Sequence, residues 1–186
     1  MDTEIILASS SPRRAELIRY LGIAFETDVS DAEEITEGAP DILTAENAKL
    51  KAQAVSRRHP GRWVLGADTL VFACRQPLGK PRDREDALRM LRILSGKWHE
   101  VYTGICLTNG TVTDTRVSVS RVHFTDMTES DMLSYIATGE PFDKAGAYAL
   151  QGAAGAFIDR AEGSFSGVIG LDICLTHQLL RSHGLI

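Results

Sequence analysis

The sequence predicts one mixed α/β domain that spans residues 1–186. Three observations support this class. Short apolar runs of the kind that form strands alternate with helical apolar stripes, a strong hairpin signal lies in the middle of the chain, and neither an internal repeat nor a low-complexity linker occurs. Hairpins with interspersed helices favour a mixed sheet over a simple doubly wound one, and a chain of this length can bury one sizeable core.

The predicted elements begin with a short buried strand at residues 5–7, followed by a helix over residues 12–22. Ser11 is typical of an N-cap, and the proline after it fits the first helical position. The apolar stripe of this helix is expected to leave Arg14 and Arg19 toward solvent. The next elements are an extended piece at 25–29, an acidic loop, a helix at 40–58 and a nearly continuous apolar strand at 63–73.

Cap and turn residues also mark the second half of the chain. Asp83 is expected to cap the third helix, and Thr128, with Asp131 three residues on, to begin the fourth. Asn109-Gly110 separates two β-branched runs and indicates a tight hairpin over residues 99–124. The remaining elements are a turn at 76–79, a strand at 156–158 and a last helix at about 172–183.

Composition and charge limit the class of function. The formal net charge of −5 argues against a general affinity for nucleic-acid backbones, but is compatible with a focused basic site for a small polyanion. No apolar run approaches the roughly 20 residues that span a bilayer, and the first residues lack the pattern of a secretory signal, so we expect a cytoplasmic protein without a membrane partner. The scattered histidines and cysteines lack zinc-site spacing. A metal is therefore expected to be magnesium-like and held by carboxylates.

The segment after the first strand has the composition of a phosphate site. Ser9, Ser10 and Ser11 place hydroxyls where an apolar strand turns into a helix, and two arginines follow. Unpaired N–H groups and the positive end of the helix favour an anion there, and Arg13 can add a bidentate fork. An ordinary capped helix with surface arginines is the alternative that the local pattern leaves open.

Two charged residues fall at positions that are expected to be buried. Asp68 interrupts the apolar strand at 63–73, and a buried carboxylate costs several kcal/mol unless a cation, a metal or hydrogen bonds compensate it. Lys51 lies in the core-facing sector of the second helix, whereas Lys49 lies on the opposite face. The alternatives are that Asp68 caps a turn or pairs with one arginine, and that Lys51 extends past a helix end to water.

Three further residues carry weaker signals on their own. Lys80 is held extended by the proline after it, Glu34 lies in the acidic loop, and Gln151 lies in a segment rich in Gly and Ala, where backbone can approach a ligand closely. Each also fits an ordinary role, as a solvated charge or as the partner of a buried backbone group. Together the candidates suit a nucleoside triphosphate, with Arg13, Lys51 and Lys80 for phosphates, Asp68 and Glu34 for a metal or water, and Gln151 for a base.

Seven ordered motifs run through the chain: LASSSPRR at 7–14, the Lys51-Ala52 pair, LGADT at 65–69, GKPRD at 79–83, LSG at 94–96, DKAGAY…QG at 143–152 and GVIGL at 167–171. In these motifs the chain resembles the Maf family of nucleoside triphosphate pyrophosphatases. It is similar to the pyrimidine subgroup acting on dTTP and UTP, which has arginine, threonine and glutamine at the positions of Arg13, Thr69 and Gln151. The 7-methyl-GTP subgroup usually has Ser-Asp-Gln in place of residues 67–69.

The resemblance implies a role for each candidate residue. The family's proton acceptor falls on Asp68, and its acidic-loop carboxylate falls on Glu34, with Glu33 adjacent. These two carboxylates would hold a divalent cation such as Mg²⁺, Mn²⁺ or Co²⁺. The residues that would bind substrate are Ser9, Ser10, Arg13, Lys51, Thr69 and Gln151, and Lys80 joins Asp68 and Glu34 in catalysis.

The resemblance also implies a long bent sheet flanked by helices around a deep nucleotide-binding cleft, and a homodimer. Two positions depart from the family pattern. Gly167 stands where an asparagine is frequent, and Asp172 stands where the family usually has proline. Because aspartate can begin a helix as proline does, only local geometry is affected.

The function implied is hydrolysis of dTTP and UTP, with CTP or modified pyrimidine nucleotides as further substrates, to the nucleoside monophosphate and pyrophosphate. This activity would remove unwanted nucleotides from the pool. One alternative is the same chemistry on a modified purine such as 7-methyl-GTP. The other is a nucleotide-binding regulator of cell division that does not turn its ligand over.

Overall fold

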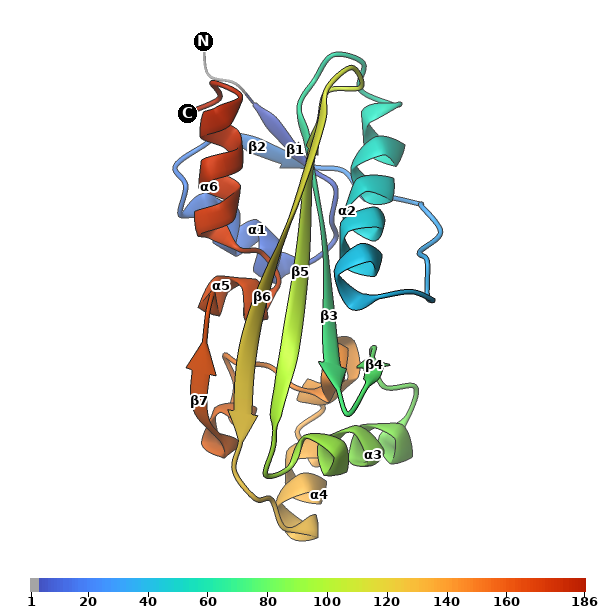
Figure 1. Cartoon of the computed structure of the whole chain (residues 1–186), viewed down its shortest axis with the longest axis vertical. Helices are drawn as coiled ribbons and strands as arrows, with labels where there is room; N and C mark the ends of the chain where they lie inside the picture. Colours follow the sequence, from blue (N-terminus) through green and yellow to red (C-terminus); the bar gives the residue numbers. More distant parts are fainter. Residues whose placement is uncertain (1–3) are drawn as a thin grey trace. The chain divides into compact units, whose positions relative to one another are not determined.

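A computed structural model describes residues 4–186, which form a seven-stranded mixed sheet flanked by helices (Figure 1). The strand order is β2-β1-β3-β5-β6-β7, and β4 pairs with β3 outside this path. β1 is parallel to β2 and β3, whereas the β3–β4 and β6–β7 pairs are antiparallel, so the predicted mixed α/β class is confirmed. The strands are β1 (Ile5–Leu7), β2 (Phe25–Thr27), β3 (Val64–Ala73), β4 (Gln76–Leu78), β5 (Trp98–Thr108), β6 (Thr113–Phe124) and β7 (Ile158–Glu162).

Several helices begin at residues that the sequence marks as caps. The side chains of Ser11, Asp83, Thr128 and Asp172 each accept a backbone N–H of the first helical turn, which satisfies a donor that has no partner within the helix. The α-helices are α1 (Pro12–Arg19), α2 (Pro40–Ser56), α3 (Arg84–Leu94), α4 (Glu129–Ala137), α5 (Phe165–Ile169) and α6 (Ile173–Ser182), and the 3₁₀ helices are η1 (Glu140–Asp143), η2 (Ala145–Ala147) and η3 (Ala153–Phe157).

The chain divides into two compact units. Unit 1 comprises Met1–Thr69, Thr103–Ser118 and Ser166–Ile186, and unit 2 comprises Leu70–Tyr102 and Val119–Phe165. The divisions fall inside β3, β5 and β6, each of which contributes residues to both units. Neither unit is therefore a single continuous stretch of the chain.

In unit 1, α2 covers one face of the sheet, and α1 and α6 cover the other (Figure 1). Successive residues of a strand point to opposite faces. On the α2 face, Ile6 and Val64 pack against Ala48, Ala52 and Val55. The cluster on the opposite face includes Ile5, Leu7, Leu65, Ala67, Leu17, Ile18, Leu179 and Leu180. The same alternation decides whether a side chain near the middle of β3 faces α2 or faces α1 and α6.

Two glycines let the backbone of α2 lie directly against the strands. A Cβ atom on Gly66 of β3 would lie 2.3 Å from the backbone oxygen of Ala48 and 2.8 Å from the backbone nitrogen of Ala52. A Cβ atom on Gly104 of β5 would lie 2.2 Å from the backbone oxygen of Thr44. Any larger residue at either position would therefore push the helix away from the sheet.

A buried aromatic group lies in unit 2 and is formed by His99, Phe124 and Tyr148. Nε2 of His99 and the Tyr148 hydroxyl are 2.7 Å apart, and the Tyr148 ring meets both other rings edge-on. Burial lowers the pKa of His99 to about 4, with a smaller contribution from His123, because a buried imidazolium would lose its hydration. His99 is therefore neutral at neutral pH.

The structure corrects several predicted boundaries. Residues 76–78 form β4 and pair with β3 instead of making a turn, and the reversal lies at Cys74 and Arg75, whose φ angles are 49° and 64°. Residues 153–157 form η3, so the strand expected at 156–158 begins only at Ile158. α1 ends at Arg19 and is shorter than predicted. Among residues 4–186, no helix has the length and apolar character needed to cross a membrane.

Candidate active site

Asp68, Lys51 and Glu34 meet on the α2 face of the sheet in unit 1. Asp68 lies two residues beyond Gly66 on β3, so its side chain points to the same face. Nζ of Lys51 lies 2.6 Å from Oδ1 of Asp68 and 2.7 Å from Oε1 of Glu34. The Lys51 and Asp68 side chains are only 14% and 13% exposed. The structure thus supplies the cation that a largely buried Asp68 requires.

Sequence reasoning missed Asn47, which joins the same group. Its Oδ1 accepts the backbone N–H of Ile35 at 2.7 Å, and its Nδ2 donates to the backbone oxygen of Ile35 at 3.0 Å and to Oδ2 of Asp68 at 3.4 Å. Asn47 lies one helical turn before Lys51, and it is 5% exposed. A buried amide in the core-facing sector of a helix was the signal that could have singled it out.

Thr69, the next residue of β3, points to the opposite face of the sheet. Its Oγ1 lies 3.3 Å from Oγ1 of Thr103, from the backbone oxygen of Gly170 and from Nη2 of Arg14. Asp68 and Thr69 are therefore neighbours in sequence whose side chains belong to two different hydrogen-bonded groups. The prediction that Thr69 contacts substrate stays a prediction.

Arg14 was expected to face solvent, and this expectation is wrong. Its Nε donates to the backbone oxygen of Gly170 at 2.8 Å, and its Nη1 donates to Oγ of Ser9 at 3.3 Å. Burial lowers the pKa of Arg14, while the carboxylates of Asp68 and Glu34 act in the opposite direction. One of its partners, Gly170, comes from near the end of the chain, 156 residues away, so a helical pattern could not reveal that contact.

The serine loop precedes α1 in the predicted way. Ser9 is buried, and its Oγ accepts the backbone N–H of Ser11 at 3.2 Å. Ser11 caps α1, whereas Ser10 is exposed. Arg13 lies in the first turn of α1 and is half-buried. The hydroxyls, the helix start and a cation are thus adjacent, which is the chemistry of an anion site.

Lys80 and Gln151 belong to unit 2. Lys80 is exposed in the loop after β4, and the backbone oxygen of its neighbour Gly79 accepts the N–H of Gly146 at 3.0 Å. Gln151 is exposed and directly precedes Gly152. Their proposed contacts with substrate stay predictions.

Glu140 holds the segment that follows Gln151. Its carboxylate accepts the Tyr135 hydroxyl at 2.8 Å and the backbone N–H of Ala153 at 2.9 Å. A Cβ atom on Gly152 would lie 2.4 to 2.6 Å from this carboxylate. The backbone beside Gln151 is therefore fixed to the start of η1, although the Gln151 side chain is exposed.

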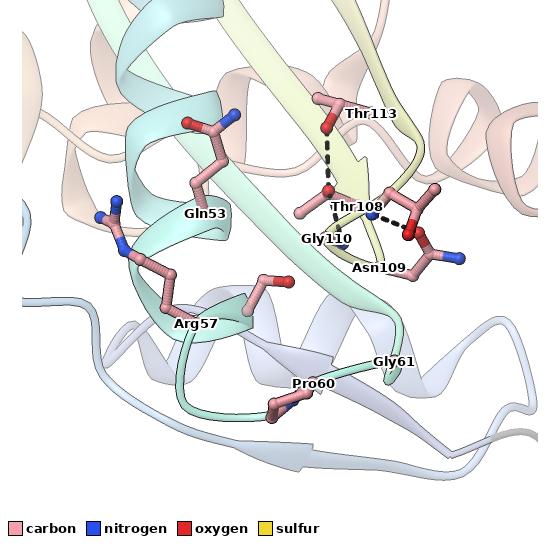
Figure 2. Close-up of a pocket in the computed structure, with 10 residues that line it drawn as sticks. Gln53, Arg57, Pro60, Gly61, Thr108, Asn109, Gly110 and Thr113 are labelled. Atoms are coloured by element: carbon pink, nitrogen blue, oxygen red, sulfur yellow. Dashed lines mark hydrogen bonds between the residues drawn. The ribbon is translucent and has the colours of Figure 1, made fainter.

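A separate cavity of about 520 Å³ lies at the C-terminal end of α2 in unit 1 (Figure 2). Gln53 of α2 and Arg57, which directly follows this helix, line it on one side, and Thr108 and Asn109 of the β5–β6 hairpin line it on the other. Oγ1 of Thr108 and Oγ1 of Thr113 lie 2.9 Å apart at its edge. This cavity surrounds neither Asp68 nor Lys51, so it is a different feature from the acidic group.

The carboxylates of Asp68 and Glu34 have the right chemistry for a hard divalent cation, but two carboxylates alone do not complete its coordination. Within the described residues 4–186, no group of three or more His, Cys, Asp and Glu side chains is arranged to hold a metal ion. Asp68 and Glu34 instead lie on either side of the Lys51 ammonium. Two carboxylates fit Mg²⁺ or Mn²⁺ where substrate phosphate oxygens and water supply the other ligands.

In unit 1, the α/β fold combines a largely buried lysine between two carboxylates with a serine-rich helix start, a combination whose chemistry suits phosphate-bearing ligands. The family described as Maf-like protein matches residues 4–183, and the chain belongs to it.

Curated relatives support this membership. A protein of Myxococcus xanthus named dTTP/UTP pyrophosphatase is 45% identical over 185 residues, which cover 98% of this chain and 94% of that protein. A protein of Aquifex aeolicus with the same name is 39% identical over 183 residues, which cover 98% and 96% of the two chains. The Staphylococcus aureus Ham1 protein has a similar fold, with a TM-score of 0.55 at 14% identity over 97% of this chain and 99% of that chain.

Proposed function

We propose that this chain is a nucleoside triphosphate pyrophosphatase that hydrolyses dTTP and UTP. The observation that carries the proposal is the position of Lys51, held between Asp68 and Glu34 on the face of the sheet. Relatives with the printed name dTTP/UTP pyrophosphatase, matched over nearly the full chain, support the same reaction. Turnover of CTP and of modified pyrimidine nucleotides belongs to the proposal as well.

The reaction breaks the anhydride bond between the α- and β-phosphates. The oxygen of a water molecule forms a bond to the α-phosphorus, the bridging oxygen leaves with pyrophosphate, and a carboxylate oxygen of Asp68 receives the proton of the water. Lys51 and Arg13 offset negative charge on the phosphates as the bond breaks, and Lys80 is proposed to do the same. Ser9 and Ser10 orient the phosphates at the start of α1.

A divalent cation such as Mg²⁺, Mn²⁺ or Co²⁺ is part of the proposal, and Asp68 and Glu34 are the residues that would hold it. Such an ion supplies Lewis-acid stabilisation of phosphate charge when it is bound. With a cation bound, Lys51 would be free to interact with the substrate phosphates, because the cation would also compensate the negative charge of Asp68 and Glu34.

Gln151 is proposed to recognise the base. Uracil and thymine present a carbonyl, a ring N–H and a carbonyl on their pairing edge, and a glutamine amide can donate to the first and accept from the second. A mismatched base would leave the polar groups of the glutamine without partners. The site can therefore discriminate between bases more strongly than an apolar contact would allow. Thr69 is proposed to share in this recognition, and its Oγ1 also lies 3.3 Å from three polar atoms that include Nη2 of Arg14.

The test is a substrate panel with the purified chain. dTTP, UTP, CTP, dATP, dGTP and 7-methyl-GTP are each supplied with Mg²⁺, Mn²⁺ or Co²⁺, and pyrophosphate is detected by phosphate release with an added inorganic pyrophosphatase. We expect the highest kcat/KM for dTTP and UTP, with the monophosphate as the other product. Preference for 7-methyl-GTP would support the modified-purine alternative, and binding without turnover would support the non-catalytic regulator.

Two further expectations accompany the activity. We propose that the protein acts in the cytoplasm, the compartment expected from the sequence. We also propose a homodimer, as the family resemblance implies, and light scattering of the purified chain measures its mass in solution directly.

A further inference from the structure

Asn47 connects two parts of the proposed active site that are distant in sequence. Its amide binds both backbone groups of Ile35, the residue after Glu34, and its Nδ2 also contacts Asp68. We propose that Asn47 is a positioning residue, which holds the Glu34 carboxylate and the Asp68 carboxylate in a fixed geometry around Lys51. This inference rests on the proposed function.

This amide anchors the acidic loop at Ile35, beside the ion pair of Glu34 with Lys51. Ile35 is 44% exposed, so its own apolar packing holds this part of the loop only in part. Both hydrogen-bonding groups of its backbone are instead taken by one buried side chain, at 2.7 and 3.0 Å. A two-point hydrogen bond of this kind fixes both position and orientation, and Glu34 is the adjacent residue.

The helix gives Asn47 and Lys51 a fixed relation to each other. They are four residues apart on α2, so their side chains lie one above the other on the same face. Lys51 approaches Oδ1 of Asp68, and Asn47 approaches Oδ2. The two oxygens of one carboxylate therefore meet different donors from the same helix, which restricts rotation of the carboxylate.

The charged groups around Asp68 come from three elements. Lys51 of α2 and Glu34 of the acidic loop contact each other, and Arg14 of α1 interacts with Asp68 electrostatically. Asn47 also contacts Asp68, but its side chain is uncharged. An aspartate in its place would keep an acceptor for the Ile35 N–H, but it would lose the donor and add a like charge about 3.4 Å from Oδ2 of Asp68.

The experiment compares Asn47→Leu and Asn47→Asp with Thr44→Val in the full-length protein. Thr44 is a matched control, because it is buried on the same helix and its hydroxyl bonds to the backbone oxygens of Pro40 and Asp41. We expect both Asn47 variants to lower kcat for dTTP by roughly ten- to a hundredfold with little change in KM. Thr44→Val should lower thermal stability alone.

Amide exchange gives a readout that does not depend on activity. The segment at residues 30–38 should exchange faster in Asn47→Leu than in the wild type or in Thr44→Val, because the Ile35 N–H loses its acceptor. Equal exchange in all three proteins, or kinetics of the Asn47 variants within twofold of Thr44→Val, would overturn the inference. Should Asn47→Leu fail to fold, Asn47→Ala supplies the exchange readout, because it also removes the acceptor of the Ile35 N–H, and Asn47→Asp supplies the kinetic readout.

The two proposals fail in different ways. If the wild type turns over no triphosphate, the proposed function fails, and the exchange measurement still decides whether Asn47 holds the loop. If the wild type is active and Asp68→Asn is inactive, but the Asn47 variants match Thr44→Val, only the positioning role fails.

Discussion

Oδ1 of Asp68 and Nζ of Lys51 lie 2.6 Å apart, and both side chains are largely removed from water. A pair in this setting gains from its mutual attraction but loses hydration on both sides, so it adds little to net stability. Removing one partner is more consequential, because an uncompensated charge is then left partly buried. The pair is therefore better explained by the chemistry of the site than by stabilisation of the fold.

Replacing Asp68 with asparagine should remove most turnover and keep the fold. The amide is nearly isosteric but is a poor base and a weak metal ligand, and Lys51 keeps Glu34 as its counter-ion at 2.7 Å. Steady-state kinetics with dTTP, measured beside a thermal melt, provides the check. A folded variant with near-wild-type kcat would show that Asp68 is not the proton acceptor.

Alanine variants of two lysines on α2 should differ sharply in kcat/KM. Lys51→Ala should lower kcat/KM by orders of magnitude, since loss of a group aimed at transition-state charge costs roughly 2.7–4 kcal/mol in comparable cases. Lys49 pairs with Glu46 at the surface at 3.4 Å, and its side chain is 37% exposed, so Lys49→Ala should have almost no effect on kcat/KM. Similar kinetics for both variants would contradict the assignment of Lys51.

Gln151→Ala should reduce discrimination between bases more than it reduces binding of phosphates. The quantity to measure is the ratio of kcat/KM for dTTP to that for dATP, in the wild type and in the variant. Gln178→Ala, which removes another exposed glutamine, serves as the control. A ratio that Gln151→Ala leaves unchanged would rule out the proposed base contact, although the hydrolysis itself could stand.

Stability should fall as the pH drops from about 6.5 to about 4, because of His99. Its pKa is about 4 in the folded protein and 6.5 as the ordinary value, so the unfolded chain binds a proton in this window that the folded chain does not. The difference corresponds to about 3 kcal/mol across the window. Denaturant unfolding at several pH values measures this loss.

The control for this pH dependence is a pair of glutamine variants. His99→Gln cannot titrate, so its free energy of unfolding should change less between pH 6.5 and pH 4. His177→Gln replaces an exposed histidine and should behave as the wild type does. An equally steep loss of stability in His99→Gln would assign the effect to other groups.

Local chemistry predicted the helix starts and part of the site. Ser11, Asp83, Thr128 and Asp172 cap helices through contacts that span only a few residues, so the sequence pattern contains the whole interaction. The partial burial of Asp68 also followed from its neighbours in the strand. Its pairing with Lys51 agrees with the core-facing position predicted for that lysine.

Long-range contacts explain what the sequence did not reveal. Arg14 lies on the expected solvent side of its own helix, but Gly170 approaches from the other end of the chain. Asn47 owes its significance to the backbone of Ile35, which no periodic pattern places beside it. The turn at Cys74 and Arg75 uses positive φ without glycine or asparagine, so the usual turn residues were absent from it.

At Gly66 and Gly104, no strand side chain separates the backbone of α2 from the sheet. In other helix-on-sheet contacts, a layer of side chains can repack and absorb a change of volume. Here a single added methyl group would displace the helix as a whole, and it would carry Lys51 and Asn47 away from Asp68 together. Laboratory evolution that samples only the polar residues would therefore overlook two glycines that control the spacing of the charged groups.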